Sequence, residues 1–204
     1  GAVVMAMTEI RRVGLDAFLP VLFGKVAAVP RSVALQQLRL SLNEFCKFSL
    51  YWEEDLGTIT PDPDNRHGYE LALPRGVKPV GDLQVMYASN DNPVPADLYR
   101  RTNPQTVVFD AGVNEPVKLV VAVNLIPTGA EVPETLLNYF GEAIAAGAAK
   151  RLVVMPQRDW SDPTMAQYHE SEYREGYNEA CRESRERFDS RNTHRRLDRR
   201  STYY

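Results

Sequence analysis

The chain has 204 residues, of which 44% are hydrophobic and 25% are charged. These values are typical of a soluble globular protein and exclude a chain that is disordered throughout, because the apolar side chains suffice for a core. The longest strongly apolar run, Val117–Ile126, is shorter than the roughly 18 residues that a transmembrane helix needs, and the first residues lack the pattern of a signal peptide. We therefore expect neither a membrane protein nor a secreted precursor.

Cysteines and histidines do not indicate a metal centre. Cys46 and Cys181 both fall in predicted helices, where we interpret each thiol as a small buried apolar group. The three histidines, His67, His169 and His194, form no pair at helical ligand spacing. We expect no metal and no cofactor.

An N-terminal arm is predicted over residues 1–30, with Thr8 placed to cap a short helix that runs to Leu19. The first long helix is predicted from Arg31 to Trp52, because apolar residues recur there at spacings of three and four. They include Leu35, Leu38, Leu40, Leu42, Phe45, Phe48 and Trp52. The acidic run Glu53–Asp55 is expected to end this helix.

A β domain is predicted over residues 56–131, inserted between helices. Its short apolar segments are bounded by Pro, Gly, Asn and Asp clusters, which is typical of antiparallel strands and turns. The predicted strands are Tyr69–Leu73, Val80–Ala88, Thr106–Asp110 and Val117–Ile126. The last of these is the most apolar and is expected to be central.

The next helix is predicted to begin near Val132, with Pro133 at its first position and Glu134 in its first turn. One side of this helix carries unusually small residues, which permit close approach by another helix. The candidates for such packing are Gly141, Ala145, Gly147 and Ala148. The neighbouring helix belongs either to the same subunit or to another copy.

Pro156 ends that helix, and Ser161 or Asp162 is expected to cap the last one, with Pro163 in its first turn. Trp160 lies just before this start, where it is expected to pack against the following turn or to serve in an interface. Helical spacing continues to about residue 188, and residues 191–204 are predicted to be an extended C-terminal tail.

The predicted fold class is therefore α+β: a bundle of three long helices with an inserted small antiparallel β module and an extended C-terminal tail. The helical domain comprises residues 31–55 and 132–190. The order of the elements is helix, sheet, helix, proline-marked turn, helix.

The C-terminal end is basic, although the whole chain has a net charge of -3. Eight arginines stand against four acidic residues between positions 182 and 200, which gives this segment a charge of +4. The arginines are Arg182, Arg185, Arg187, Arg191, Arg195, Arg196, Arg199 and Arg200. Three interpretations stay open: a solvated helix face with i, i+4 ion pairs, contact with nucleic acid, and docking onto an acidic protein surface. The terminal Tyr203 and Tyr204 favour a protein partner, because tyrosine is enriched at interfaces.

Catalytic motifs of the nucleotide-binding, hydrolase and zinc-protease types are absent from the sequence. The acidic cluster Glu53, Glu54, Asp55, Asp62 and Asp64 has oxygen ligands suited to a divalent cation, but we interpret it as a solvated turn. We do not expect an enzyme. A hydrolase with an unrecognised nucleophile is the remaining enzymatic alternative.

The motifs in the C-terminal half of the chain occur in an order that resembles a family of tailed-bacteriophage proteins. The run Val132–Leu152 is followed by Met155-Pro, by Trp160-Ser-Asp-Pro-Thr-Met-Ala and by the aromatic stripe of residues 168–185. Together with residues 38–52 and the strand at Tyr69, this resembles the head-to-tail adaptors (connectors) related to tail tubular protein A of short-tailed phages. The resemblance covers about residues 28–188.

The resemblance implies a structural virion protein without enzymatic activity, located in the neck and tail region and assembled in the host cytoplasm. Such adaptors form a homo-oligomeric ring, commonly of twelve copies, which docks under the portal protein and continues the DNA channel without reading sequence. The ring also carries downstream nozzle or fibre-bearing tail proteins. On this analogy, residues 182–204 would order against the portal.

Two alternatives remain to the adaptor. The first is a nucleic-acid-binding module that uses the arginine-rich tail, and the second is a neck stopper or tail-completion protein.

Overall fold

The structure, a computed structural model, describes residues 11–62, 64–65 and 67–198, except for the side chains of residue 82 and residues 188–198. The chain forms two compact units. Unit 1 comprises residues 1–42 and 130–176, and unit 2 comprises residues 43–129 and 177–204. Two of the boundaries fall inside long helices, so each of these helices contributes to both units.

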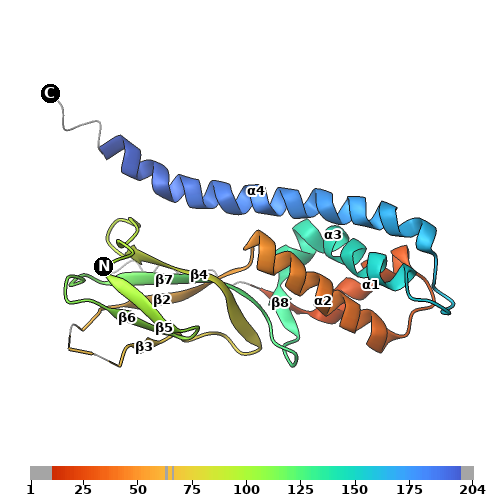
Figure 1. The fold of residues 1–204 in the computed structure, drawn as a ribbon, viewed down its shortest axis with the longest axis horizontal. Helices are drawn as coiled ribbons and strands as arrows, with labels where there is room; N and C mark the ends of the chain where they lie inside the picture. Colours follow the sequence, from red (N-terminus) through yellow and green to blue (C-terminus); the bar gives the residue numbers. More distant parts are fainter. Residues whose placement is uncertain (1–10, 63, 66, 199–204) are drawn as a thin grey trace, which may run out of the picture. The chain divides into compact units, whose positions relative to one another are not determined.

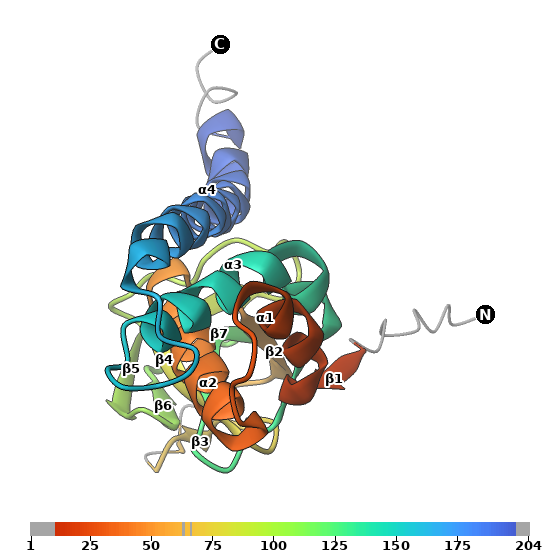
Figure 2. The same cartoon turned by 90° about the vertical axis from the view of Figure 1, so that its right-hand side faces the viewer.

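Unit 1 is built from helices and one short β ribbon. Helices α1 and α3 lie side by side in it (Figures 1 and 2). The described helices of the chain are α1 (Leu19–Lys25), α2 (Arg31–Ser49), α3 (Glu134–Val153), α4 (Ala166–Asp198), and the 3-10 turns η1 (Leu15–Phe18) and η2 (Pro163–Met165).

The ribbon of unit 1 consists of β1 (Arg12–Gly14) and β8 (Glu131–Pro133), which pair antiparallel. The Leu15 amide also donates to the Ala130 carbonyl at 2.7 Å, which extends the pairing by one bond. The helix predicted to end at Leu19 is wrong for residues 12–14, which pair with a strand far along the chain; residues 15–18 form η1, and the predicted cap Thr8 lies outside the described residues. A helix does follow, and Pro20 lies in its first turn, where a missing N–H costs nothing.

Unit 2 contains two three-stranded antiparallel sheets. In the first, β7 is central between β2 and β4; in the second, β6 is central between β3 and β5. β7 is buried almost along its whole length, so the prediction of a central, highly apolar strand is confirmed. The strands are β2 (Glu53–Ile59), β3 (Tyr69–Glu70), β4 (Val77–Tyr87), β5 (Tyr99–Asn103), β6 (Thr106–Phe109) and β7 (Val117–Leu125).

Side chains of β5 connect the two sheets of unit 2. Arg101 donates to the Gly81 carbonyl at 3.0 Å, and the Tyr99 hydroxyl donates to the Leu83 carbonyl at 3.5 Å. Both carbonyls lie on β4, at the step where its register with β7 shifts. Side chains of the second sheet thus donate hydrogen bonds to backbone carbonyls of β4 in the first sheet, near the irregularity in its pairing with β7.

The predicted architecture, a three-helix bundle with a small β module and an extended tail, is wrong. The described residues contain four α-helices and eight strands in three antiparallel sheets. Strands β1, β2 and β8 were missed because their partners lie far away in the sequence, and β5, although it pairs with the neighbouring β6, was missed because its side chains are mostly polar. The backbone of residues 191–198 is helical and continues α4, and residues 199–204 lie outside the described part.

Three residues of the predicted acidic cluster, Glu53–Asp55, form a strand rather than a solvated turn, whereas Asp62 and Asp64 are exposed in the turn region that follows, as predicted. The helix ends at Ser49, and Glu53–Asp55 pair with β7 in the first sheet. Glu54 is buried and accepts a hydrogen bond of 2.8 Å from Trp52 Nε1. Asp55 forms an ion pair of 3.1 Å with Lys118 on the neighbouring strand. Local charge indicated solvent exposure, but each acid has a specific partner in the sheet.

Candidate functional site

The arginine-rich half of α4 begins in unit 2, where aromatic and polar side chains hold it against the α2–β2 junction. The ring of Tyr177 meets the ring of Phe45 edge-on, with centroids 6.3 Å apart. About two turns further along the helix, the Ser184 hydroxyl donates to the Leu50 carbonyl at 3.5 Å. These contacts fix the first three turns of this half of the helix.

Arg187 is committed to the protein itself. Its guanidinium carbon lies 4.3 Å from the centroid of the Tyr51 ring, and Nη2 donates to the Tyr51 carbonyl at 3.4 Å. A cation–π contact of this kind contributes about 0.5–2 kcal/mol, depending on desolvation. Arg187 was a candidate for contact with a partner, and the structure gives it an anchoring position within unit 2.

Arg182 and Arg185 face solvent on the same helix. Arg182 lies 3.6 Å from Glu179 and 3.9 Å from Glu186, which are the intrahelical pairs expected of a solvated face. Exposed pairs of this type contribute only about 0–1 kcal/mol to stability. Both arginines are exposed, and Arg185 also lines a groove.

The remaining arginine candidates lie further out. Arg191, Arg195 and Arg196 are on the last described turns of α4, and their side chains are outside the described part. The candidates Arg199, Arg200, Tyr203 and Tyr204 lie entirely outside the described residues. The structure therefore separates the candidates into an anchored arginine, two exposed ones, and a distal group.

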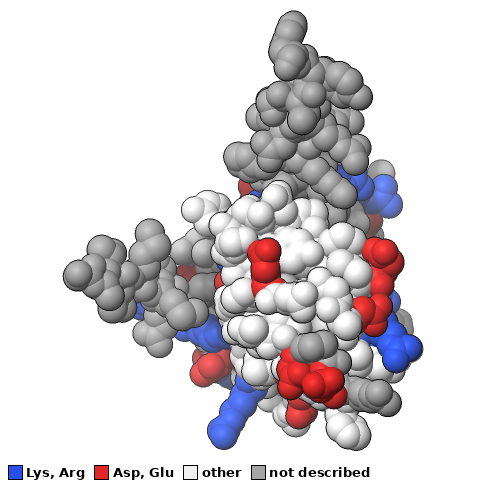
Figure 3. Space-filling model, turned by 90° about the vertical axis from the view of Figure 1, so that its left-hand side faces the viewer, with Lys and Arg blue, Asp and Glu red and all other residues white. Residues whose placement is uncertain are grey.

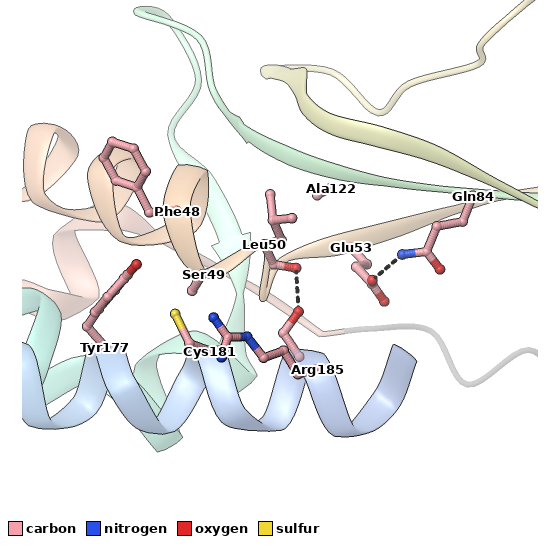
Figure 4. A pocket seen from close by; sticks show the side chains of 10 residues that line it. Phe48, Ser49, Leu50, Glu53, Gln84, Ala122, Tyr177, Cys181 and Arg185 are labelled. Carbon is pink, nitrogen blue, oxygen red and sulfur yellow. Dashed lines mark hydrogen bonds between the residues drawn. The ribbon is translucent and has the colours of Figure 1, made fainter. Parts of the chain in front are cut away.

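A groove of about 580 Å³ lies in unit 2 between the end of α2 and α4 (Figure 4). We call it the α2–α4 groove. Its apolar wall consists of Phe48, Leu50, Tyr177 and Cys181, and its rim carries Glu53 and Arg185. Glu53 accepts a hydrogen bond of 2.8 Å from Gln84.

Two large apolar side chains of this groove are exposed. Phe48 is 59% exposed and Leu50 is 38% exposed. Leu50 also has a φ of 54°, in the left-handed region that side chains other than glycine rarely adopt. Sequence analysis assigned Phe48 to the buried stripe of the first helix. No local pattern distinguished Phe48 from its buried neighbours, because the apolar stripe of α2 is wider than the part of this helix that other residues cover.

The two cysteines differ in environment. Cys46 is fully buried, as predicted, and burial raises the pKa of its thiol. Cys181 is only partly buried, in the wall of the groove. A hydrogen bond between Cys181 and Tyr177, together with burial, raises the pKa of the Tyr177 hydroxyl.

The small residues of α3 are used inside unit 1. Gly141, Ala145, Gly147 and Ala148 are all buried. A Cβ on Gly147 would lie 2.6 Å from the Tyr173 ring, and Ser41 beside it donates to the Ile144 carbonyl at 2.7 Å. All four residues are thus covered by this same chain, and at Gly147 the neighbours are Ser41 of α2 and Tyr173 of α4.

Trp160 lies in the turn before η2, where the Asp162 side chain caps as predicted by accepting from the Thr164 amide. The Trp160 ring is half-buried, with the Arg158 guanidinium carbon 5.8 Å from its centroid. Its Nε1 is buried and has no hydrogen-bond partner among the described residues.

An ionic cluster in unit 1 was missed by sequence analysis. Lys25 Nζ lies 2.9 Å from Glu142 and 3.1 Å from Glu172, and Glu172 also contacts Nδ1 of the buried His169 at 3.2 Å. Burial alone would lower the pKa of Lys25, but hydrogen bonds to the two carboxylates outweigh it and raise that pKa. At Glu172, burial alone would raise the pKa, but hydrogen bonds and charge interactions with Lys25 and His169 stabilise the carboxylate and lower that pKa.

Within the described residues, no group of three or more His, Cys, Asp or Glu side chains is arranged to hold a metal ion. None of the described helices combines the length and apolarity needed to cross a bilayer.

No protein-family model matches the chain, and a search of curated proteins likewise found no match.

Proposed function

We propose that this chain is a structural head-to-tail adaptor of a tailed-bacteriophage virion. In this proposal, copies form a homo-oligomeric ring that docks under the portal, continues the DNA channel and carries downstream tail proteins. The distal part of α4 is the portal-binding element. The proposal combines the sequence resemblance with the chemistry of this helix.

The observation that carries the proposal is the form of α4. This helix runs without interruption over 33 residues, from Ala166 to Asp198. Its last described contact with the rest of unit 2 is that of Arg187 with Tyr51. The eleven residues from Phe188 to Asp198 continue the helix for about 16 Å at 1.5 Å per residue. An anchored helix with a basic continuation supports docking onto an acidic protein surface.

The surface charge supports a protein partner over nucleic acid in one respect. Figure 3 shows a face on which acidic and basic side chains are scattered around a largely uncharged area. The exposed Arg182 also has acidic neighbours on its own helix. Binding dominated by DNA phosphates requires basic groups whose charge is not already balanced.

The ring interface in this proposal cannot use the small face of α3, because that face is buried within unit 1. Exposed aromatic residues elsewhere on unit 1 suit a subunit contact better. Tyr139 is 72% exposed and Tyr168 is 56% exposed, and tyrosine is enriched at interfaces.

The test measures the mass of the chain in solution, alone and after mixing with a cognate portal ring. A variant that ends after Ser190 removes the distal arginines but keeps the contact between Arg187 and Tyr51. We expect the full chain to join the portal as a stoichiometric ring and the shortened chain to fail.

Charge variants refine this test. Arg195→Glu with Arg196→Glu is expected to abolish portal binding, whereas the exposed control Arg75→Glu in a turn of unit 2 is expected to leave it intact. The absence of portal binding by the full chain, together with salt-sensitive binding to DNA, would reject the adaptor and establish the nucleic-acid module.

A further inference from the structure

Two apolar side chains of the α2–α4 groove, Phe48 and Leu50, are exposed to solvent, and hydrogen bonds hold the backbone of Leu50 in place. Leu50 is held in its left-handed conformation from both sides, since its amide donates to the Cys46 carbonyl at 3.0 Å and its carbonyl accepts from Ser184. Strained backbone conformations of this kind concentrate at binding sites. Adjacent Phe48 adds a second exposed apolar surface.

The chemistry of the groove selects an uncharged apolar segment as its occupant. Its wall is apolar, and its rim carries one acidic and one basic residue, Glu53 and Arg185, whose charges are opposite. The sequence from Ala2 to Met7, Ala-Val-Val-Met-Ala-Met, is six consecutive residues without charge. Valine is compact and methionine is flexible, so such a segment fits an irregular apolar surface.

The other end of the chain is a poorer match. Residues 199–204 begin with Arg199 and Arg200, and the single acid of the rim, Glu53, does not balance these two charges together with that of Arg185. By contrast, residues 1–10 precede Arg11 and, fully extended, span at most about 33–36 Å. This length is sufficient for an arm that leaves unit 1 and contacts a neighbouring molecule.

We propose that residues 2–7 of one copy bind in the α2–α4 groove of a second copy. Each copy then offers one arm and one groove, so the contact is head-to-tail and repeats from copy to copy. The inference rests on the homo-oligomeric part of the proposed function, and it names the segment and the surface that join neighbouring subunits.

A disulfide tests this contact directly, because Cys181 already lies in the wall of the groove and Cys46 is fully buried. Val4→Cys in the full chain is expected to link to Cys181 on mild oxidation and to give a ladder of oligomers on a non-reducing gel. Glu9→Cys, outside the apolar segment, is expected to give no ladder. Val4→Cys combined with Cys181→Ser should give at most the dimer that joins two introduced cysteines.

Mass spectrometry on a mixture of ordinary and isotope-labelled chains identifies which chains the link between residues 4 and 181 joins. A link between two copies supports the inference. A link within one chain overturns it, and so does the absence of the link or an equal ladder from the Glu9→Cys control.

Alkylation of Cys181 gives an independent measurement without new cysteines. Because each copy supplies one arm and one groove, about three-quarters of the grooves are occupied at a total protein concentration ten times the dissociation constant, so N-ethylmaleimide should react about fourfold more slowly than in a variant lacking residues 2–7. Phe48→Ser is expected to remove this protection, whereas Leu40→Ser, which changes an exposed apolar residue of α2 outside the groove, is expected to retain it. Equal rates with and without residues 2–7 would overturn the inference.

Portal binding separates this inference from the adaptor proposal. A chain without residues 2–7 that still assembles as a ring on the portal would overturn the arm contact and leave the adaptor in place. A chain that forms the 4–181 link between copies but binds no portal would support the arm contact and overturn the adaptor proposal.

Discussion

Replacing Gly147 by alanine in the middle of α3 has two opposite effects on stability, a gain in helix propensity and a steric clash with neighbouring side chains. Alanine is favoured over glycine in a helix interior by about 1 kcal/mol. However, the added Cβ would lie 2.6 and 2.8 Å from two carbon atoms of the Tyr173 ring, and it would also meet Ser41 Oγ. Distances under 3 Å require one of the neighbours to move.

The neighbours have little freedom to move. Tyr173 is 6% exposed, and Lys150 Nζ lies 4.2 Å above its ring. Ser41 is 1% exposed and is fixed by its hydrogen bond to the Ile144 carbonyl. Overpacking of a well-packed core costs about 1–3 kcal/mol. Because both neighbours are held in place, we expect a cost in the upper half of this range, about 2–3 kcal/mol. Gly147→Ala should therefore lower the free energy of unfolding by about 1–2 kcal/mol after the gain in helix propensity, about 1 kcal/mol, is subtracted.

Gly24 in α1 is the matched control, because a Cβ at that position meets nothing within 4 Å. Gly24→Ala should gain the helix propensity without the collision and stabilise the protein by up to about 1 kcal/mol. The assay is urea unfolding followed by circular dichroism at the helical minimum. With a slope of about 2 kcal/mol/M, Gly147→Ala should lower the midpoint by roughly 0.5–1 M.

The reasoning is refuted if Gly147→Ala unfolds at the same urea concentration as the parent chain or at a higher one, while Gly24→Ala is stabilised. That pair of results would mean that the face between α3, Ser41 and Tyr173 has space for a methyl group.

Three further predictions concern other parts of the molecule. Glu54→Ala should lower the free energy of unfolding by about 1–3 kcal/mol, because it leaves the buried Trp52 Nε1 without this acceptor; an unchanged urea midpoint would contradict it. Under native conditions a thiol reagent at pH 8 should modify Cys181 and spare Cys46, whose thiol is buried and has a raised pKa; two reactive thiols before unfolding would contradict this. The hydrogen bond from Lys150 is the main cause of the lowered pKa of Glu170, so the stability it contributes is present above the unfolded pKa of about 4.3 and is lost as pH falls through the folded value. Thermal melts across this range should therefore show less acid sensitivity in Glu170→Gln than in the parent chain, and identical pH profiles would reject this assignment.

Sequence periodicity by itself determined the long helices and the most apolar strands. The start of α2 at Arg31 and the position of β7 follow from local apolar spacing and turn residues, whereas α3 begins at Glu134, because Val132 and Pro133, predicted to open this helix, end strand β8. These features depend on which face of a segment is apolar, and that information is local.

Only the tertiary structure decided which segments pair and which surfaces stay exposed. β1 and β8 pair across more than a hundred residues, and β2 becomes a strand because β7 supplies its partner and Trp52 its buried donor. From the sequence, the small residues of α3 could pack against a helix of the same subunit or of another copy, and the structure shows that Ser41 and Tyr173 of the same chain lie against Gly147. Likewise, Phe48 and Leu42 have the same helical character, but only Leu42 is covered. Pairing and covering are long-range properties, so they depend on chain segments that no local pattern identifies.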